Sequence, residues 1–252
     1  MKPTTKKAVY ASHGIEYKDG KILSPIGWIK PLLKEGNSKV GKACYTFSLP
    51  AGTKGTCICD CEHCYAKSGF YAMPSVKESL KRNQAIIESY PEFARHAILA
   101  QIIADKITMV RIHASGDFHT ANEKEYTQLW FGIVQSNPSV KFWTYTKIGD
   151  YESLFDSLGN ANIVPSVLPF KLGFNFGTCE QLLNAYKLMA KHGIKPHICE
   201  CGTDESHHCE NCAGCSVNKY VLFILHSTAD YNAKNDPLLP AIADIIAKQE
   251  KA

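Results

Sequence analysis

The sequence lacks any apolar stretch that could span a membrane. Its longest apolar runs, VLFIL and AIADIIA, are far shorter than the roughly 20 residues that a transmembrane helix needs. Lysine and arginine are scattered without a polybasic block, and the formal net charge is only +4. Affinity for a phosphate backbone is therefore neither demanded nor excluded, and nucleic-acid binding is unsupported. We expect a cytoplasmic protein with no membrane association.

Common catalytic signatures are absent as well. The chain has no GxxxxGK[ST] phosphate loop, no GxGxxG after a strand, no GxSxG nucleophile elbow and no HExxH zinc motif. Cys179 opens a predicted helix after Gly177 and Thr178, a position where the helix dipole favours a thiolate. A nucleophilic cysteine is therefore kept as a minor alternative.

Cysteine is what the sequence has in excess. Of its eleven cysteines, five lie between Cys44 and Cys64, five lie between Cys199 and Cys215, and Cys179 stands alone. A chain of 252 residues with 45% hydrophobic residues and no signal peptide does not need disulfides to fold. Closely spaced thiols cannot pair usefully with one another, whereas thiolates that converge on one centre suit a soft metal. We predict metal binding.

Hydrophobic periodicity predicts an alternation of strands and helices. Strands are expected over 44–50, 108–118 (a strand and its loop), 140–147, 162–170, 172–177, 194–200 and 219–227. Helices are expected over 73–106 with a break near Pro91, 122–136, 150–158, 179–193 and 237–252. Repeated strand–helix units imply parallel strands with right-handed crossovers. We predict an α/β fold, a partial or distorted TIM-like (β/α) barrel over residues 41–252, with residues 1–40 as an N-terminal extension packed on it.

In such a barrel, ligands bind at the carboxyl ends of the strands. Both cysteine blocks follow predicted strands, and so do the SGDF and YTK segments that end at Phe118 and Lys147. We therefore expect metal-binding loops, and polar groups that face them, on one rim of the barrel.

The first block has the spacing CxxxCxxC, formed by Cys57, Cys61 and Cys64. A tight loop of this kind can deliver three thiolates to a [4Fe-4S] cluster and leave its fourth iron open, whereas structural zinc usually has four protein ligands and CxxC pairs. Cys59 lies only two residues from Cys57 and from Cys61, so we expect it to be a spare thiol. The block predicts an iron–sulfur cluster.

The order of these features resembles that of the radical SAM superfamily: a first strand, CxxxCxxC with an aromatic beside its last cysteine, a helix, and a second strand ending in a Gly–acid loop. The resemblance implies that Cys57, Cys61 and Cys64 hold the cluster and that its open iron is chelated by S-adenosylmethionine (SAM). Ser115, Gly116 and Asp117 would then stand for the Gly-Gly-Glu loop that holds the amino group of SAM. The aromatic residue, Tyr65, follows the last cysteine here, where the family usually has it before that cysteine.

A closer resemblance covers most of residues 40–228. The succession FSLPAG, C…CYA, RIHASGDF, WTYTK and C…CxxCxxC, followed by a strand that ends in His226, resembles the phage gene-product-eighty-eight family. It implies an iron–sulfur protein of viral or mobile-element origin, acting in the host cytoplasm, and it supplies no reaction.

The second block offers Cys209, Cys212 and Cys215 as CxxCxxC, with Cys199 or Cys201 upstream as the fourth ligand. This ferredoxin-like spacing favours a second [4Fe-4S] cluster, which would serve structure or electron transfer because no iron is left open. Zinc is the alternative, since His207 and His208 lie beside the block.

Three polar residues near the predicted strand ends are candidate catalytic groups: His113, Asp117 and Lys147. The two-residue period of a strand places Arg111, His113 and Ser115 on one face. They either line a polar lumen that binds a ligand or form a buried network with protein partners. Likewise Asp117 either binds a ligand or caps a helix, and Lys147 either meets an anionic group or is an exposed lysine.

The sequence supports three functional hypotheses. The first is radical-SAM-like chemistry on an unknown substrate, which also requires an electron donor. The second is an iron–sulfur protein for electron transfer or binding that never binds SAM. The third is a zinc-stabilised protein that binds a host partner.

Overall fold

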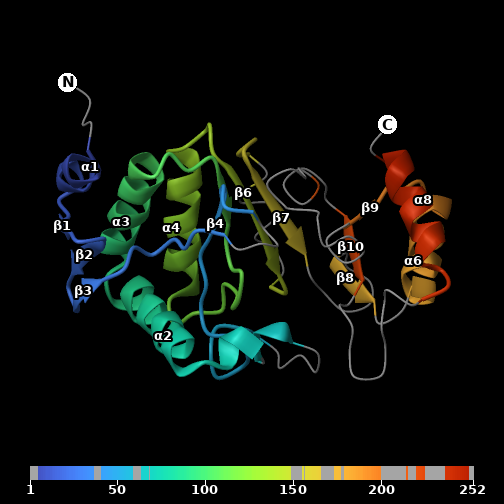
Figure 1. Cartoon of the computed structure of the whole chain (residues 1–252), viewed down its shortest axis with the longest axis horizontal. Coiled ribbons are helices and arrows are strands. Elements are labelled where there is room, and N and C mark those ends of the chain that lie inside the picture. The colour runs from blue at the N-terminus through green and yellow to red at the C-terminus, as the bar shows by residue number, and fades with distance from the viewer. Residues whose placement is uncertain are drawn as a thin grey trace.

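The computed structural model of the chain describes residues 5–36, 41–58, 64–67, 69–148, 155, 157–165, 173–176, 179–199, 214, 220–224 and 236–249. Within these residues two parallel sheets lie between helices α3 and α4 on one side and helices α6 and α8 on the other (Figure 1). No helix in this described part is both long enough and apolar enough to cross a membrane.

The first sheet has four parallel strands in sequential order: β4 (Cys44–Thr46), β5 (Met109–Arg111), β6 (Lys141–Thr146) and β7 (Ala161–Pro165). Helices α2 (Pro74–Ser89) and α3 (Pro91–Ala104) connect β4 to β5, and α4 (Glu123–Gln135) connects β5 to β6. The expected break near Pro91 is confirmed, because Tyr90 leaves helical geometry and Pro91 begins α3. The fold is therefore mixed α/β with a parallel sheet, as the sequence predicts.

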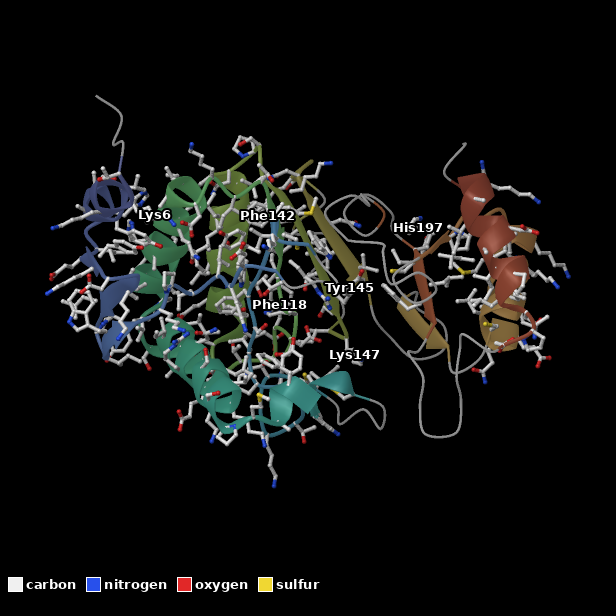
Figure 2. The ribbon with its side chains drawn as sticks, viewed as in Figure 1. Lys6, Phe118, Phe142, Tyr145, Lys147 and His197 are labelled. Carbon is white, nitrogen blue, oxygen red and sulfur yellow. The ribbon has the colours of Figure 1, made fainter. Side chains whose placement is uncertain are left out.

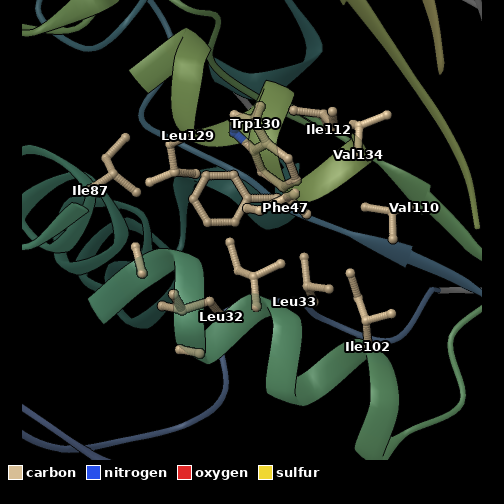
Figure 3. Packing of buried hydrophobic residues seen from close by; sticks show 14 of the residues in the cluster. Leu32, Leu33, Phe47, Ile87, Ile102, Val110, Ile112, Leu129, Trp130 and Val134 are labelled. Atoms are coloured by element: carbon tan, nitrogen blue, oxygen red, sulfur yellow. The ribbon is translucent and has the colours of Figure 1, made fainter. Parts of the chain in front are cut away.

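A large hydrophobic core lies between this sheet and its helices (Figure 3). Val110 of β5, Ile102 of α3 and Leu129 of α4 all belong to it. At its centre the ring of Phe47 meets Trp130 edge to face, with ring centroids 5.4 Å apart. This core fixes the position of the segment that leads from β4 to the first cysteines.

The N-terminal residues form helix α1 (Lys6–Ser12) and an antiparallel sheet of β1 (Tyr17–Lys18), β2 (Lys21–Ser24) and β3 (Gly27–Ile29). The side-chain amide of Gln101 in α3 donates to the carbonyl of Leu33 at 2.8 Å and accepts from its N–H at 2.9 Å. Tyr10 and Ile22 are buried in the same core as the first sheet. The predicted division at residue 40 stays a prediction.

The second sheet contains β8 (Gly173–Phe176), β9 (His197–Ile198) and β10 (Val221–Ile224), all parallel, with β10 between the other two. Helices α6 (Cys179–Lys191) and α8 (Leu239–Gln249) cover it through a cluster that includes Ile198 and Leu222. In a simple barrel β8 and β9 would be neighbours, and no ladder joins β7 to β8 among the described residues. A closed barrel is thus not detected there. Of the predicted helix over 150–158, only Phe155, Ser157 and Leu158 are described.

The two sheets meet through the faces that point away from their helices. Trp143 and Val164 of the first sheet share a buried cluster with Val221 and Cys199 of the second. Nearby, the rings of Tyr145 and Phe223 meet edge to face at 5.2 Å. The alternation of a strand explains this arrangement, because Phe142 faces the helices while Trp143 faces the other sheet.

Candidate functional site

The chain after β4 runs beside the chain after β5 and then turns into a compact loop. The N–H of Leu49 donates to the carbonyl of Ser115 at 2.9 Å. The loop closes where the N–H of Thr56 donates to the carbonyl of Pro50 at 2.9 Å, and the N–H of Cys57 donates to that of Gly52 at 3.2 Å. Cys57 therefore lies at the end of a loop whose backbone is fixed by its own hydrogen bonds. This loop is at the carboxyl end of the sheet.

The Ser115–Gly116–Asp117 segment braces this loop. The hydroxyl of Ser115 donates to the carbonyl of Leu49 at 2.8 Å, and the N–H of Asp117 donates to the hydroxyl of Thr56 at 3.0 Å. Gly116 has a φ of +81°, and a Cβ at this position would lie 2.6 Å from the Thr56 hydroxyl. Only glycine combines this backbone conformation with so close an approach.

The carboxylate of Asp117 ties the same segment to the end of β6. Its Oδ1 accepts hydrogen bonds from the Thr146 hydroxyl at 2.6 Å and from the Phe118 N–H at 2.8 Å, and its Oδ2 accepts from the Lys147 N–H at 2.8 Å. The residue is 3% exposed. Burial raises the pKa of Asp117, while these hydrogen bonds and the charge of Lys147 oppose that shift. Asp117 thus joins three segments of the protein at the predicted site.

Lys147 follows β6 directly and is half-buried. Figure 2 shows it beyond the end of the strand. Tyr145, two residues earlier in the chain, packs at the interface between the sheets, where the Arg111 guanidinium lies 5.3 Å from its ring centroid. The backbone N–H of Lys147 donates to Asp117, so these two residues lie side by side at the carboxyl end of the sheet, and their predicted catalytic roles stay predictions.

His113 lies in a buried network rather than on an alternating strand. The predicted alternation through Ser115 is wrong beyond Arg111, because β5 ends there and His113 takes a φ of +58°. Its Nε2 shares a hydrogen bond of 2.6 Å with the Tyr126 hydroxyl, and its Nδ1 lies 3.5 Å from the Thr144 hydroxyl. Burial, aided by the charge of Arg111, lowers the pKa of His113 to about 3, so the imidazole is neutral. Its predicted catalytic role stays a prediction.

Cys57 and Cys64 are the described members of the first block, and both are half-buried. Cys61 and Cys59 lie outside the described residues. After Cys64 come the short helices η1 (Tyr65–Lys67) and η2 (Gly69–Ala72), and the Tyr71 hydroxyl of η2 donates to the carbonyl of Ala114 at 3.4 Å. Both sides of the block are thus tied to the loop after β5. The soft thiol donors fit iron or zinc, although the described residues alone contain no group of three metal-binding side chains.

The second block follows a strand of the other sheet. Cys199 comes directly after β9 and is buried in the apolar cluster between the sheets. Cys201, His207, His208, Cys209, Cys212 and Cys215 lie outside the described residues, as does His226. Cys44, in contrast, begins β4 and therefore lies at the end of the strand opposite to the Cys57 loop.

Sequence reasoning missed the residues that hold the site together. Thr56 and Thr146 carry the hydroxyls that meet Asp117, and Tyr126 holds His113. A helical period over 122–136 places Tyr126 on the buried face of α4, so that residue was within reach of the sequence. No pattern marks the two threonines, since their partners are distant in sequence.

Comparisons with known proteins identify relatives of this chain by sequence. A family model described as Gene product 88 matches residues 30–168, which is more than half of the chain and includes every element of the first sheet and the first cysteine block. The Gene 88 protein of Mycobacterium phage L5 is 26% identical over 129 residues, covering 46% of this chain and 52% of that protein. The chain thus spans about half the length of this curated relative. No solved structure matches the chain.

Proposed function

Since the chain belongs to the gene product 88 family, with a relative in a mycobacteriophage, we propose that it is a phage iron–sulfur protein. In this proposal Cys57, Cys61 and Cys64 bind a [4Fe-4S] cluster at the carboxyl edge of the first sheet. When bound, such a cluster supplies one-electron chemistry.

The observation that carries the proposal is the set of contacts by which Ser115, Gly116 and Asp117 hold the loop before Cys57. A loop that only connected β4 to α2 would not need two hydroxyls, a buried carboxylate and a glycine of positive φ to fix the residue before Cys57. Metal ligands do need such support, because their orientation sets the affinity of the site. The CxxxCxxC spacing supports iron as the metal.

Within this proposal, binding or electron transfer is the leading role. Asp117 is 3% exposed, and its carboxylate already accepts three hydrogen bonds from the protein. A carboxylate that must hold the ammonium group of SAM would have to leave these donors or share its oxygens with them. The contacts of the Ser115–Gly116–Asp117 segment therefore fit a structural role in holding the loop before Cys57 better than they fit SAM binding.

Radical-SAM-like chemistry is the second candidate. It is favoured by the parallel order β4-β5-β6-β7, in which the cysteine block follows the first strand, as expected for a partial barrel of that superfamily. In this candidate Cys57, Cys61 and Cys64 would hold the cluster, which would supply the electron for reductive cleavage of the sulfonium of SAM. Lys147 and Asp117 would then orient the ligand at the carboxyl edge, for an unknown substrate and with an external electron donor.

Anaerobic purification of the full chain with quantification of iron and acid-labile sulfide tests the proposal. We expect both in the wild-type protein and their loss from the first block in Cys57→Ala and in Cys64→Ala. Cys179→Ala, a buried cysteine of α6 outside both blocks, is the matched control and should keep them. Wild-type protein free of iron would contradict the proposal. A change in the EPR spectrum of the reduced protein on adding SAM would favour the second candidate.

A further inference from the structure

The outer face of the N-terminal sheet exposes large apolar side chains to solvent. Leu23 of β2 and Trp28 of β3 are register partners, and they are 40% and 43% exposed. Ile26, in the turn that joins these two strands, is 48% exposed. Ile22 and Ile29, the neighbouring pair, point to the opposite face and are buried in the core. The sheet therefore packs on the molecule with one apolar face and presents a second one to solvent.

The turn between β2 and β3 fixes the order of these side chains. The hydroxyl of Ser24, a buried residue, donates to the carbonyl of Gly27 at 2.7 Å and accepts from the N–H of Ile26 at 3.3 Å. Ile26 therefore lies at the tip of the hairpin, and the Leu23–Trp28 pair forms the next row. Figure 1 shows this sheet at the end of the molecule opposite to α6 and α8, so the hairpin lies at one extremity of the structure.

Lysines form the row behind the apolar tip. Lys21 precedes Leu23 by two residues on β2 and so lies on the same outer face, and its register partner is Lys18 of β1. The register between β2 and β3 places Lys30, directly after β3, on the other side of Lys21. All three lysines are exposed. Since residues two apart in a strand are separated by about 6.5–7 Å, the charges begin one such step behind the Leu23–Trp28 pair.

We propose that this hairpin binds the surface of an anionic lipid bilayer. Segments that bind membrane surfaces place apolar side chains about 5–10 Å into the boundary between headgroups and acyl chains, and place lysines at the anionic headgroups. The separate rows of the hairpin match these two depths, and tryptophan favours the same interface. A single-stranded nucleic acid would instead need several aromatic side chains for successive bases, whereas Trp28 is the single aromatic residue on the outer face of the described sheet.

The contact is peripheral, and the proposal departs from the expectation of no membrane association, which rested on the lack of a spanning segment. The hairpin up to Ile29 precedes the residues that match the family model. The inference therefore goes beyond the proposed iron–sulfur function and does not depend on a cluster at Cys57.

Two carboxylates of the sheet define how it would approach the bilayer. The N–H of Leu23 donates to the carbonyl of Glu16 at 2.9 Å, so Glu16 lies beside Leu23 on the side away from Trp28. Asp19 lies in the turn between β1 and β2, at the end of the sheet away from the hairpin tip. Anionic headgroups repel both carboxylates, so we expect the β3 edge to lie deepest. Three lysines against these two carboxylates leave the outer face with a net positive charge.

Tryptophan fluorescence of the full chain with phospholipid vesicles tests the proposal. Trp130 and Trp143 are buried, so a change of emission on binding reports Trp28. We expect a blue shift and co-sedimentation with vesicles of phosphatidylcholine and phosphatidylglycerol in equal amounts. Binding should be much weaker to phosphatidylcholine alone and should weaken in about 0.5 M NaCl.

A chain that binds neither kind of vesicle would overturn the proposal. A response of Trp28 to a single-stranded oligothymidylate but not to vesicles would assign the face to nucleic acid instead. A dimer that dissociates in Trp28→Ala, without vesicle binding, would assign it to a second copy of the chain.

Co-sedimentation of variants locates the contact on the hairpin. Trp28→Ala should weaken binding to the anionic vesicles at least about tenfold, and Lys21→Gln about fivefold. Glu16→Lys should strengthen it, so opposite changes of charge move the affinity in opposite directions. Leu188→Ser, at an exposed leucine of α6, is the matched control and should bind as wild type. Wild-type binding by both Trp28→Ala and Lys21→Gln would overturn the role of the hairpin.

Discussion

The backbone N–H of Asp117 donates a hydrogen bond of 3.0 Å to the hydroxyl of Thr56, and so joins the loop after β5 to the residue before Cys57. The two residues are 61 positions apart, yet both are buried at the carboxyl end of the same parallel sheet. The Thr56 hydroxyl in turn donates to the carbonyl of Pro50 at 3.0 Å. One hydroxyl thus links the two loops that would carry and support the first metal site.

Thr56→Val should lower the free energy of unfolding by about 1–3 kcal/mol, because the buried N–H of Asp117 loses its acceptor while side-chain volume is kept. Urea denaturation of the two proteins measures the difference. Thr108→Val, at an exposed threonine before β5, is the matched control and should change stability by less than about 0.5 kcal/mol. Equal losses of stability in the two variants would argue against a stabilising hydrogen bond between Thr56 and Asp117.

Gly116→Ala should destabilise the fold for two reasons, the positive φ of this residue and the lack of space for a Cβ. An alanine there would have to adopt a φ of +81° and would place its Cβ only 2.7 Å from Cβ of Leu49. Together these two effects should lower the free energy of unfolding by about 2–5 kcal/mol. Gly20→Ala has a similar φ of +75° but open space around it, so it isolates the backbone cost, about 1–2 kcal/mol. Gly159→Ala has neither problem and should lose no stability. A ranking by urea denaturation in which Gly116→Ala does not exceed Gly20→Ala contradicts the close approach.

His113 should make the protein less stable in acid. Its folded-state pKa of about 3 lies below the ordinary value of about 6.5, so the unfolded chain binds the proton more readily. The stability it contributes is fully present above pH 6.5 and is lost as the pH falls towards 3. In His113→Asn, whose side chain tolerates a positive φ, this loss is absent. The stability difference between wild type and variant should therefore shrink from pH 7 to pH 4; a constant difference would contradict a buried neutral imidazole.

Tyr126→Phe should destabilise the fold through His113. The substitution removes the hydroxyl that lies 2.6 Å from Nε2 and leaves a buried nitrogen without that partner, at a cost of about 1–3 kcal/mol. Tyr90→Phe, at a tyrosine that is 38% exposed, is the control and should have little effect on thermal unfolding. If the two variants melt alike, the hydrogen bond to His113 is not a stabilising contact.

Local patterns predicted most of the elements of this fold. The alternation of periods gave the strands and helices near their observed places, and Pro91 marked the break between α2 and α3, because these features depend on neighbours in the chain. The position of β10 between β8 and β9 was not predictable, since strand order is set by tertiary packing. The turn of the backbone at His113 was also missed. It depends on contacts with Tyr126 and Phe118 that no two-residue period encodes.

The candidate site was predictable to the level of residue types. The sequence placed Asp117 and Lys147 at one end of the sheet, and the structure brings them together through a hydrogen bond from the Lys147 N–H. It did not predict that the Asp117 carboxylate is enclosed by protein donors. This enclosure arises from contacts between segments far apart in the chain, which spacing alone does not reveal.

Element analysis of two block variants tests the central claim most directly. Iron, acid-labile sulfide and zinc per chain are measured in anaerobically purified wild type, in Cys57→Ala/Cys61→Ala/Cys64→Ala and in Cys209→Ala/Cys212→Ala/Cys215→Ala. The account predicts iron and sulfide in the wild type, their loss from the first block in the first variant, and their retention at that block in the second variant. Zinc without iron in the wild type, or loss of iron and sulfide only with the second block, would contradict it.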